Sequence, residues 1–393
     1  MLRGKIIFVN RVFWPSEAAT AQLLTDLALA LGARGWDVHV IASGTTPAAG
    51  VPPEITIHRT GAEPAGRVGR YSHFLLAARR QLAALVSPGD IVVLKTDPPL
   101  LAVAATRLAR ARGAHVVQWI QDIYPEVVWR HLGIWAAPLL WPLQLARNAA
   151  WRASDACVVL SDDMLAAVRA AGVPRERSLI SNNWAPRELE TPATAAQIAT
   201  VRAEWQVGDG FVVAYSGNFG RVHEMDTLLA TALQLRDEPS IHFVLSGSGA
   251  RWPEVADFVA RHALTNVRLL PPQPRARLAA TLAAADAHFV TLRPGFERCV
   301  FPSKLAGIFA AGRTVIFVGA PDSQCATLAR HAGRAFAPGD AAEIARTIRD
   351  WRADPGEIAR LHSAARAEFT GGFAFGTRLA EWERLLGSLV GRA

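Results

Sequence analysis

Short apolar runs alternate with longer segments in which apolar residues recur at helical spacing, and this alternation starts at the first residues of the chain. Strand and helix patterns that alternate in this way are typical of a parallel sheet with right-handed crossover helices. In the first part of the chain the helices are expected at 17–34, 71–86 and 100–112 and from Asp162 onward. The expected strands are 5–10, 37–42, 55–59, 90–95, 115–120, 155–160 and 178–181.

The periodicity breaks at 182–187, where the chain reads Asn-Asn-Trp-Ala-Pro-Arg, and the alternation then starts again. The second series of strands is expected at 211–215, 241–245, 267–270 and 287–292, followed by an apolar strand that ends at Val318. Its helices are expected at 224–235, 253–262 and 275–284, before Gly312, and near Cys325, Ile344 and Ile358. The fold class is therefore α/β, with two Rossmann-like, doubly wound domains facing a cleft.

The last predicted helix, 376–389, carries an apolar face with Leu379, Trp382 and Leu386, and we expect it to cross back to the first domain. The predicted domains are thus 1–186 together with 374–393, and 187–373. A length of 393 residues with 51% hydrophobic residues is enough to fill two cores.

The basic balance of the chain narrows the choice of partners. A formal charge of +8 favours an anionic partner. The arginines are spread along the whole chain, and nucleic-acid-binding signatures are absent, so nucleic acid is not expected. The 3 cysteines lie far apart, which indicates neither disulfides nor a zinc site, and fits a reducing cytoplasm. Neither a catalytic metal motif nor a nicotinamide-binding glycine motif is found.

The uncharged run 131–146 is interrupted by Pro138 and Pro142 and is too short to span a bilayer. It contains Trp135 and Trp141, and arginines flank it on both sides. Two interpretations of 131–152 stay open: a segment lying in the membrane interface, or a buried helical hairpin.

Three segments of the second half contain residues that suit phosphate binding. Segment 216–224 reads SGNFGRVHE, directly after a strand and before a helix, so that its glycines allow a close approach and Arg221 can bind a phosphate. A tight turn between strand and helix, with a solvated arginine, is the alternative. Segment 246–251 reads SGSGAR and follows the next strand; here a plain turn is the stronger explanation. Lys304 is expected at the start of a helix, where a cation opposes the helix dipole unless an anion binds. A solvated lysine is the alternative.

In the first half, Asp122 follows an apolar strand, where a carboxylate can orient or deprotonate a sugar hydroxyl. Capping of the next helix explains it equally well. Asp97 ends another strand and fits turn chemistry, and the loop 10–20 ends the first strand, with Ser16 as a possible helix cap.

Several segments together resemble glycosyltransferase family 4, of the GT-B fold, and in particular its bacterial colanic-acid and O-antigen subgroup. They are FWPSEAATAQLLTDLALALGARGWDVHVIAS, KTDPPLL, QWIQDIYPEV, ISNNWAP, YSGNFGRVHEMDTLL and FERCVFPSKLAGIFAAGRTVIFVGAPDS. The resemblance implies retaining transfer of a hexosyl or N-acetylhexosaminyl group from a UDP-sugar to a polyprenyl-diphosphate-linked saccharide. It also implies a cytoplasmic enzyme on the inner membrane face that needs neither metal nor cofactor.

The resemblance also implies roles for residues. Arg221 and Lys304 would neutralise the leaving diphosphate, Glu297 would contact the donor sugar, and Asp122 matches the aspartate of a His-Asp pair. The donor residues implied are Gly217, Asn218, Gly220, Arg221, Ser246, Gly247, Pro272, Gln273, Pro302, Ser303 and Lys304. The acceptor residues implied are Ser16, Glu17, Thr20, Asp97 and Tyr124.

This chain departs from the wider family at two places. Cys299 and Gly307 stand where the family has two glutamates, the second of which binds the donor ribose, and Ala18-Ala19 stand where paired glycines are common. A UDP-sugar 2-epimerase of the same architecture and a non-catalytic nucleotide-sugar-binding protein are the alternative functions.

Overall fold

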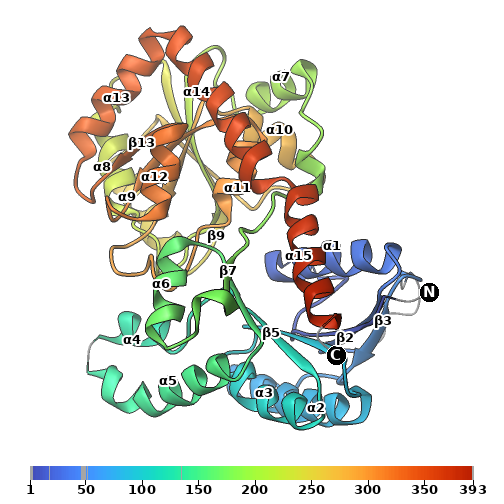
Figure 1. The fold of residues 1–393 in the computed structure, drawn as a ribbon. Helices are drawn as coiled ribbons and strands as arrows, with labels where there is room; N and C mark the ends of the chain where they lie inside the picture. The colour runs from blue at the N-terminus through green and yellow to red at the C-terminus, as the bar shows by residue number, and fades with distance from the viewer. Residues whose placement is uncertain (1–2, 17, 46–49, 51, 134, 392–393) are drawn as a thin grey trace. The chain divides into compact units, whose positions relative to one another are not determined.

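The computed structural model describes residues 3–16, 18–45, 50, 52–133 and 135–391, which form two compact units. Unit 1 consists of Met1–Asn182, Arg298–Val300 and Arg378–Ala393, and unit 2 of Asn183–Glu297 and Phe301–Thr377. Each unit contains one parallel sheet between helices, as the alternation of strands and helices predicts (Figure 1). The prediction of two Rossmann-like α/β domains is therefore confirmed.

The sheet of unit 1 has the order β3-β2-β1-β4-β5-β6-β7, and every pair is parallel. Its strands are β1 (Lys5–Val9), β2 (Asp37–Ala42), β3 (Thr56–Arg59), β4 (Ile91–Lys95), β5 (His115–Trp119), β6 (Ala156–Val159) and β7 (Ser178–Ile180). Its helices are α1 (Ala19–Ala33), α2 (Arg67–Leu85), α3 (Leu101–Ala111), α4 (Glu126–Leu132), α5 (Ala136–Arg152) and α6 (Asp162–Ala170).

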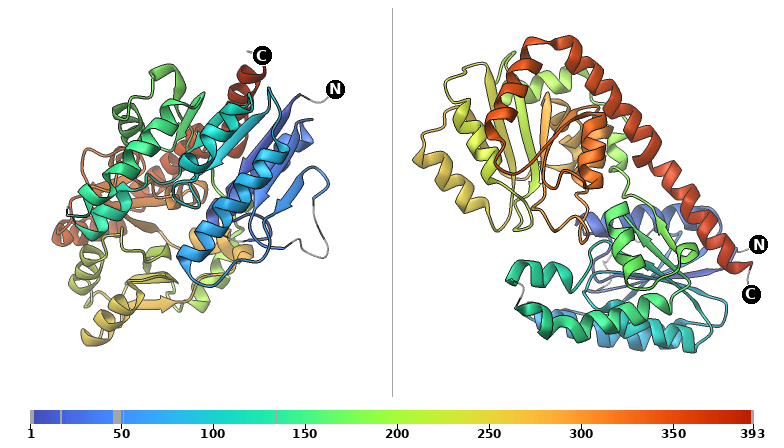
Figure 2. Two further views of the ribbon diagram at one scale, coloured as in Figure 1. Left: turned by 90° about the horizontal axis from the view of Figure 1, so that it is seen from below. Right: turned by 60° about the vertical axis from the view of Figure 1, so that its left-hand side comes forward.

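Helices α2, α3 and α5 lie side by side as a layer on one face of this sheet (Figures 1 and 2). Side chains that alternate along β1 and β4, such as Val9 and Leu94, pack against Phe74 and Leu82 of α2. A strand buried on both faces needs apolar residues at nearly every position, which explains the continuous apolar runs in the sequence.

The sheet of unit 2 has the order β10-β9-β8-β11-β12-β13. Its strands are β8 (Phe211–Asn218), β9 (Ile241–Ser248), β10 (Val267–Leu270), β11 (Ala287–Thr291), β12 (Thr314–Val318) and β13 (Gly333–Phe336). Its helices are α7 (Ala195–Glu204), α8 (Asp226–Gln234), α9 (Trp252–Arg261), α10 (Leu278–Ala283), α11 (Lys304–Ala310), α12 (Gln324–His331), α13 (Ala341–Ala353) and α14 (Pro355–Glu368).

The last helix, α15 (Phe375–Val390), begins in unit 2 and continues in unit 1, so the predicted return to the first domain is confirmed. Within unit 1, Trp382 of α15 packs on Trp119 of β5, with ring centroids 4.8 Å apart. Glu381 accepts a hydrogen bond from Ser181 and pairs with Arg378 at 3.0 Å. Apolar burial and the hydrogen bond from Ser181 hold α15 on this unit, while the Arg378–Glu381 ion pair lies within the helix.

Both sheets reverse their strand order at one place, between β1 and β4 in unit 1 and between β8 and β11 in unit 2. In open parallel sheets, ligands bind at the carboxyl ends of the strands beside such a reversal. The topology therefore gives each unit one edge at which a functional site is expected.

Candidate functional site

In unit 2, the carboxyl ends of β8 and β9 lie at the sheet edge where a functional site is expected. Both strands extend further than the sequence pattern predicts, because Gly217 pairs with Gly247 and Asn218 with Ser248. A Cβ atom on Gly247 would lie 1.8 Å from the carbonyl oxygen of Gly217. The two strands approach so closely at Gly247, which is buried, that only glycine fits there. Gly217 and Asn218, by contrast, are exposed.

Arg221 lies in the turn after β8, and its side chain is exposed. The predicted helix follows this turn, but α8 begins at Asp226 rather than at Glu224. The carboxylate of Glu224 accepts the backbone N–H groups of Asp226 and Thr227, each at 3.0 Å. These two donors are already satisfied, so a phosphate at this edge depends on side chains more than on the α8 dipole.

Lys304 is the first residue of α11, and its side chain turns inward rather than into solvent. Its amine lies 3.5 Å from the centre of the Tyr215 ring, is buried, and has no hydrogen-bond partner among the described residues. A Cβ atom on Gly217 would lie 3.8 Å from Nζ. Burial holds the pKa of Lys304 well below that of an ordinary lysine. The alternative of a solvated lysine is therefore excluded.

His223 lies beside this lysine and is held in one orientation. Its Nδ1 is 2.7 Å from the carbonyl oxygen of Thr291, at the end of β11. Burial, with a contribution from the charge of Lys304, lowers the pKa of His223 to about 4. The imidazole is therefore neutral at physiological pH, and Nδ1 carries the proton that it donates to Thr291.

The other predicted donor residues of unit 2 are placed as follows. Glu297 is half-buried and accepts the backbone N–H of Gly295 at 2.6 Å, and Ser246 donates to the carbonyl oxygen of Pro271. Pro272 is exposed and Gln273 is half-buried after β10, whereas Pro302 is buried and Ser303 is exposed directly before α11. Gly220 is half-buried, beside the Asn218 amide.

Gly307 is buried in α11, where a Cβ atom would lie 3.4 Å from side-chain atoms of Leu189 and of Leu282. The residue presents no polar group, and its surroundings are apolar. A donor ribose cannot be held by a side chain at this position.

In unit 1, Asp122 lies in the loop after β5. Its backbone N–H donates to Oγ1 of Thr96 at 3.3 Å and its backbone forms a bridge with Val300. Pro125 is the residue before α4, so Asp122 is not the cap of that helix. Burial, with the nearby charge of Asp97, raises the pKa of Asp122 to about 6. A carboxylate with this pKa suits proton transfer near neutral pH.

Asp97 follows β4 and is half-buried, with Oδ1 3.1 Å from Nε of Arg11. Arg11 also pairs with Glu63 at 3.1 Å. Asp97 therefore holds the loop after β1 through Arg11. This contact is additional to the turn role that the sequence predicts for Asp97.

The remaining predicted acceptor residues lie near this edge. Ser16 is exposed and accepts the N–H of Ala18, the residue that precedes α1, so Ser16 is not itself the cap. The carbonyl oxygen of Thr20 accepts a bond from the amine of Lys95. Tyr124 is half-buried and its carbonyl oxygen accepts a bond from Arg147. Glu17 lies outside the described residues.

Lys95, Thr96 and Tyr215 contact predicted site residues, and the sequence pattern did not identify any of them. Lys95 reads as the last position of an apolar strand and Tyr215 as a core residue. One signal was available for Lys95, because the chain has only 3 lysines among 42 basic residues.

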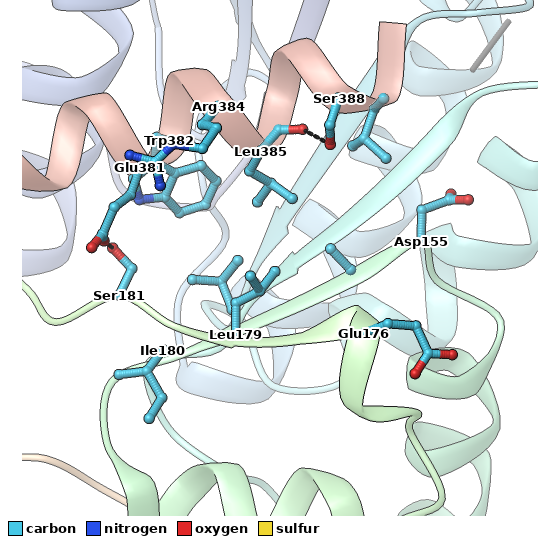
Figure 3. Close-up of a pocket in the computed structure, with 13 residues that line it drawn as sticks. Asp155, Glu176, Leu179, Ile180, Ser181, Glu381, Trp382, Arg384, Leu385 and Ser388 are labelled. Carbon is cyan, nitrogen blue, oxygen red and sulfur yellow. Dashed lines mark hydrogen bonds between the residues drawn. The ribbon is translucent and has the colours of Figure 1, made fainter. Parts of the chain in front are cut away.

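A cavity of about 380 Å³ lies elsewhere in unit 1, between α15 and strands β6 and β7 (Figure 3). Trp382 and Leu385 face Leu179 across it. The cavity is set apart from the predicted site residues, none of which lines it.

Segment 131–152, most of which forms α5, exposes several of its large apolar residues. Trp135, Leu139 and Trp141 are 81%, 80% and 58% exposed, so the interpretation of a buried hairpin is wrong for these side chains. The helix is held from its inner side, where Arg147 pairs with Glu126 at 2.7 Å and lies 3.9 Å from the Trp151 ring. None of the described helices is both long and apolar enough to cross a membrane.

Comparison with known families agrees with this architecture. Residues 19–184 match the glycosyl transferase 4-like domain, and residues 210–354 match the glycosyl transferases group 1 domain. Together the two matches cover most of both units. The chain therefore belongs to the glycosyltransferases of the GT-B type.

Two relatives indicate which subgroup of these glycosyltransferases the chain resembles. WcaI of Escherichia coli K12, described as a colanic acid biosynthesis glycosyl transferase, is 28% identical over 163 residues, which are 41% of this chain and 40% of WcaI. WbjE of Pseudomonas aeruginosa, described as a glycosyltransferase, is 27% identical over 288 residues, which are 71% of this chain and 69% of WbjE. The chain thus aligns with less than half of WcaI.

Solved structures share the fold over nearly the whole chain. Alr3699/HepE of Anabaena, in complex with UDP and glucose, superimposes with a TM-score of 0.75 at 17% identity, covering 98% of this chain and 100% of HepE. Sucrose-phosphate synthase of Thermosynechococcus elongatus reaches a TM-score of 0.79 at 18% identity, covering 99% and 100%.

Proposed function

We propose that this chain is a retaining, metal-independent glycosyltransferase that moves a sugar from a UDP-sugar to a lipid-linked saccharide at the cytoplasmic face of the membrane. The observation that carries the proposal is the amine of Lys304, which is buried beside Gly217 and has no hydrogen-bond partner in the part of the chain that the structure describes. A buried cation without a partner is unfavourable, and a bound diphosphate removes that cost. The structure of HepE with UDP and glucose supports the choice of donor.

In this proposal the donor binds to unit 2. Lys304 and Arg221 neutralise the charge that develops on the departing UDP, and preorganised charges of this kind can replace a metal ion. Among the described residues, no group of three or more His, Cys, Asp and Glu side chains could hold a metal ion. Glu297 is assigned to the donor sugar, and Pro272 and Gln273 to the base.

The acceptor binds to unit 1 in this proposal. Asp122 orients the acceptor hydroxyl and, with a pKa of about 6, can accept a hydrogen bond or a proton from it at neutral pH. Ser16, Thr20, Asp97 and Tyr124 are assigned to the acceptor side.

A donor screen tests the proposal. Purified protein is heated with a set of nucleotide sugars, because a ligand at 100 times its dissociation constant stabilises the folded state by about 2.7 kcal/mol. Turnover of the selected donor is then measured with a polyprenyl-diphosphate saccharide. We expect Lys304→Ala and Arg221→Ala each to reduce turnover about 100-fold, with folding retained.

Three results would contradict the proposal: unchanged turnover in both variants, an inverted anomeric configuration in the product, or an epimerised nucleotide sugar formed without acceptor. Proton NMR of the products distinguishes the last two.

The membrane part of the proposal rests on the outer surface of helices α2 to α5. Nine of the ten exposed large apolar side chains of the described residues lie on these helices or on the link between α4 and α5. They are Val68, Leu76, Val103, Leu132, Trp135, Leu139, Trp141, Leu143 and Leu145.

The charges of this outer surface have one dominant sign. Helices α2, α3 and α5 contain seven exposed arginines and no Asp or Glu, while an eighth arginine, Arg147, is buried. Exposed tryptophans among arginines fit the interface of an anionic bilayer, where each basic residue near the surface contributes about 1 kcal/mol.

Co-flotation with phosphatidylcholine–phosphatidylglycerol vesicles tests this surface. Replacing Trp135 and Trp141 together with Ser removes apolar burial in the interface, and we expect bound protein to fall about 10-fold or more. Leu179→Ser is the control, since Leu179 is the tenth exposed apolar residue and lies on β7. Equal binding of the double variant and the control, with unchanged thermal stability, would exclude docking through α5.

A further inference from the structure

Three consecutive residues at the end of β4 hold the segments that follow β1 and β5 at the unit 1 edge. Lys95 donates to the carbonyl oxygen of Thr20, in the first turn of α1, at 3.0 Å. Thr96 accepts the backbone N–H groups of Gln121 and Asp122, at 3.2 and 3.3 Å. Asp97 binds the side chain of Arg11. The segment 95–97 thus connects β4 to the loops that follow β1 and β5.

Lys95 occupies the innermost of these three positions. It is 1% exposed, and its amine lies 3.8 Å from the centre of the Trp119 ring. A long flexible cation is rarely enclosed to this degree unless its charge has partners. Besides the Thr20 carbonyl and the indole, the charges that act on it are those of Asp97 and Asp122.

We propose that Lys95 is the positioning residue of the acceptor side, which fixes the start of α1 against β4 and supplies the positive charge shared by Asp122 and Asp97. The role of Asp122 itself rests on the function proposed above, but the electrostatic coupling of Lys95 to Asp122 does not.

The charges around Lys95 account for how the group titrates. Burial lowers the pKa of Lys95 to about 7, and the two aspartates oppose that shift. Asp122 has a pKa of about 6, raised by burial and by Asp97 and lowered by Lys95. Asp97 is in turn paired with Arg11, which also holds Glu63. Lys95 and Asp122 therefore both titrate near neutral pH, and the charge of each favours the charged form of the other.

The scarcity of lysine makes this coupling directly measurable. Protein labelled with ¹³C and ¹⁵N in lysine alone gives signals from only 3 side chains. In the wild-type protein we expect the Lys95 signal to show two inflections, one for its own titration near pH 7 and one for Asp122 near pH 6. In Asp122→Asn the second inflection disappears, and the midpoint of Lys95 falls by about 0.5 pH units or more.

Lys5 is the internal control in the same spectra. It lies at the start of β1, at the opposite end of the sheet, and pairs with Asp90 at 2.8 Å. Its titration should not change in Asp122→Asn. A single inflection for Lys95 in the wild-type protein, or an unchanged midpoint in Asp122→Asn, would overturn the proposal.

Activity gives a second and separate readout. Lys95→Met removes the positive charge near Asp122, so the acid limb of the kcat/KM profile should move to higher pH, whereas Lys5→Met should leave it in place. A Lys95 that titrates with Asp122, in a protein that transfers no sugar, would support the positioning role and reject the proposed function. An acid limb unchanged in Lys95→Met would count against Lys95 as a positioning residue.

Discussion

The two sheet edges differ in the partners that each provides for its buried lysine. Lys95 in unit 1 and Lys304 in unit 2 both lie over an aromatic ring beside the point where the strand order reverses. Lys95 donates to a backbone carbonyl and lies within reach of the charges of Asp97 and Asp122, whereas Lys304 has no hydrogen-bond partner among the described residues. The first lysine completes the protein's own structure, and the second is suited to a partner from solution.

The presence or absence of a hydrogen-bond partner distinguishes a structural lysine from a ligand-binding one more clearly than burial does. Burial depresses the pKa of both amines, so the shift alone does not identify the ligand site. The hydrogen-bond partners do identify the ligand site, because a buried polar group without a hydrogen-bond partner is unfavourable until a ligand binds to it.

The largest expected effect is on the free energy of unfolding, which should change in opposite directions in Lys304→Met and Lys95→Met. At pH 7, Lys304→Met should raise the free energy of unfolding by about 1–3 kcal/mol, because it removes a desolvated amine that has no hydrogen-bond partner among the described residues. Lys95→Met should lower it by about 1–3 kcal/mol, since the Thr20 carbonyl loses its donor and the nearby charges of Asp97 and Asp122 lose an opposite charge. Urea denaturation measures both values.

The pH dependence sharpens this contrast. The pKa of Lys304 is lowered by folding, so between that pKa and the ordinary value near 10.4 the unfolded chain binds more protons. The stability of the wild-type protein should therefore rise with pH in this range, and Lys304→Met should flatten the rise. A loss of stability in Lys304→Met at pH 7 would show that the amine has a partner within the protein.

A smaller effect is expected when UDP binds. An anion beside Lys304 favours the charged amine, so the pKa of Lys304 should rise by about 1 unit or more while that of Lys95 stays the same. Lysine NMR with and without UDP measures both in one sample. A shift of Lys95 in place of Lys304 would assign the anion to unit 1 and reverse the comparison.

The alternation of strands and helices was sufficient to predict both sheets, because a parallel strand buried on both faces must be apolar throughout. Local packing was harder to predict. Nothing in SGNFGRVHE shows that Gly217 pairs with Gly247, or that Glu224 satisfies the N-terminal donors of α8. Both features depend on a neighbouring strand or on where a helix begins, which periodicity does not determine.

The residues of the candidate site were predictable where a motif carries them, as for Lys304 and Asp122. Their surroundings were not: the Tyr215 ring beneath Lys304 is contributed by a strand 89 positions earlier in the chain, and periodicity marks it only as core. The exposure of Trp135 and Trp141 also needed the structure, since composition fitted a buried hairpin equally well.

The packing of Trp382 on Trp119 has a consequence for the order in which the chain folds during synthesis. Unit 1 comes first in the sequence, yet α15 contributes Trp382 and Leu386 to its interior. Domains usually fold as they leave the ribosome, the N-terminal one first. Here every residue of unit 2 is made before the part of α15 that belongs to unit 1, so the second unit can finish folding while the first still has an open face at Trp119. Losing α15 to a premature stop would leave that face uncovered beneath Lys95.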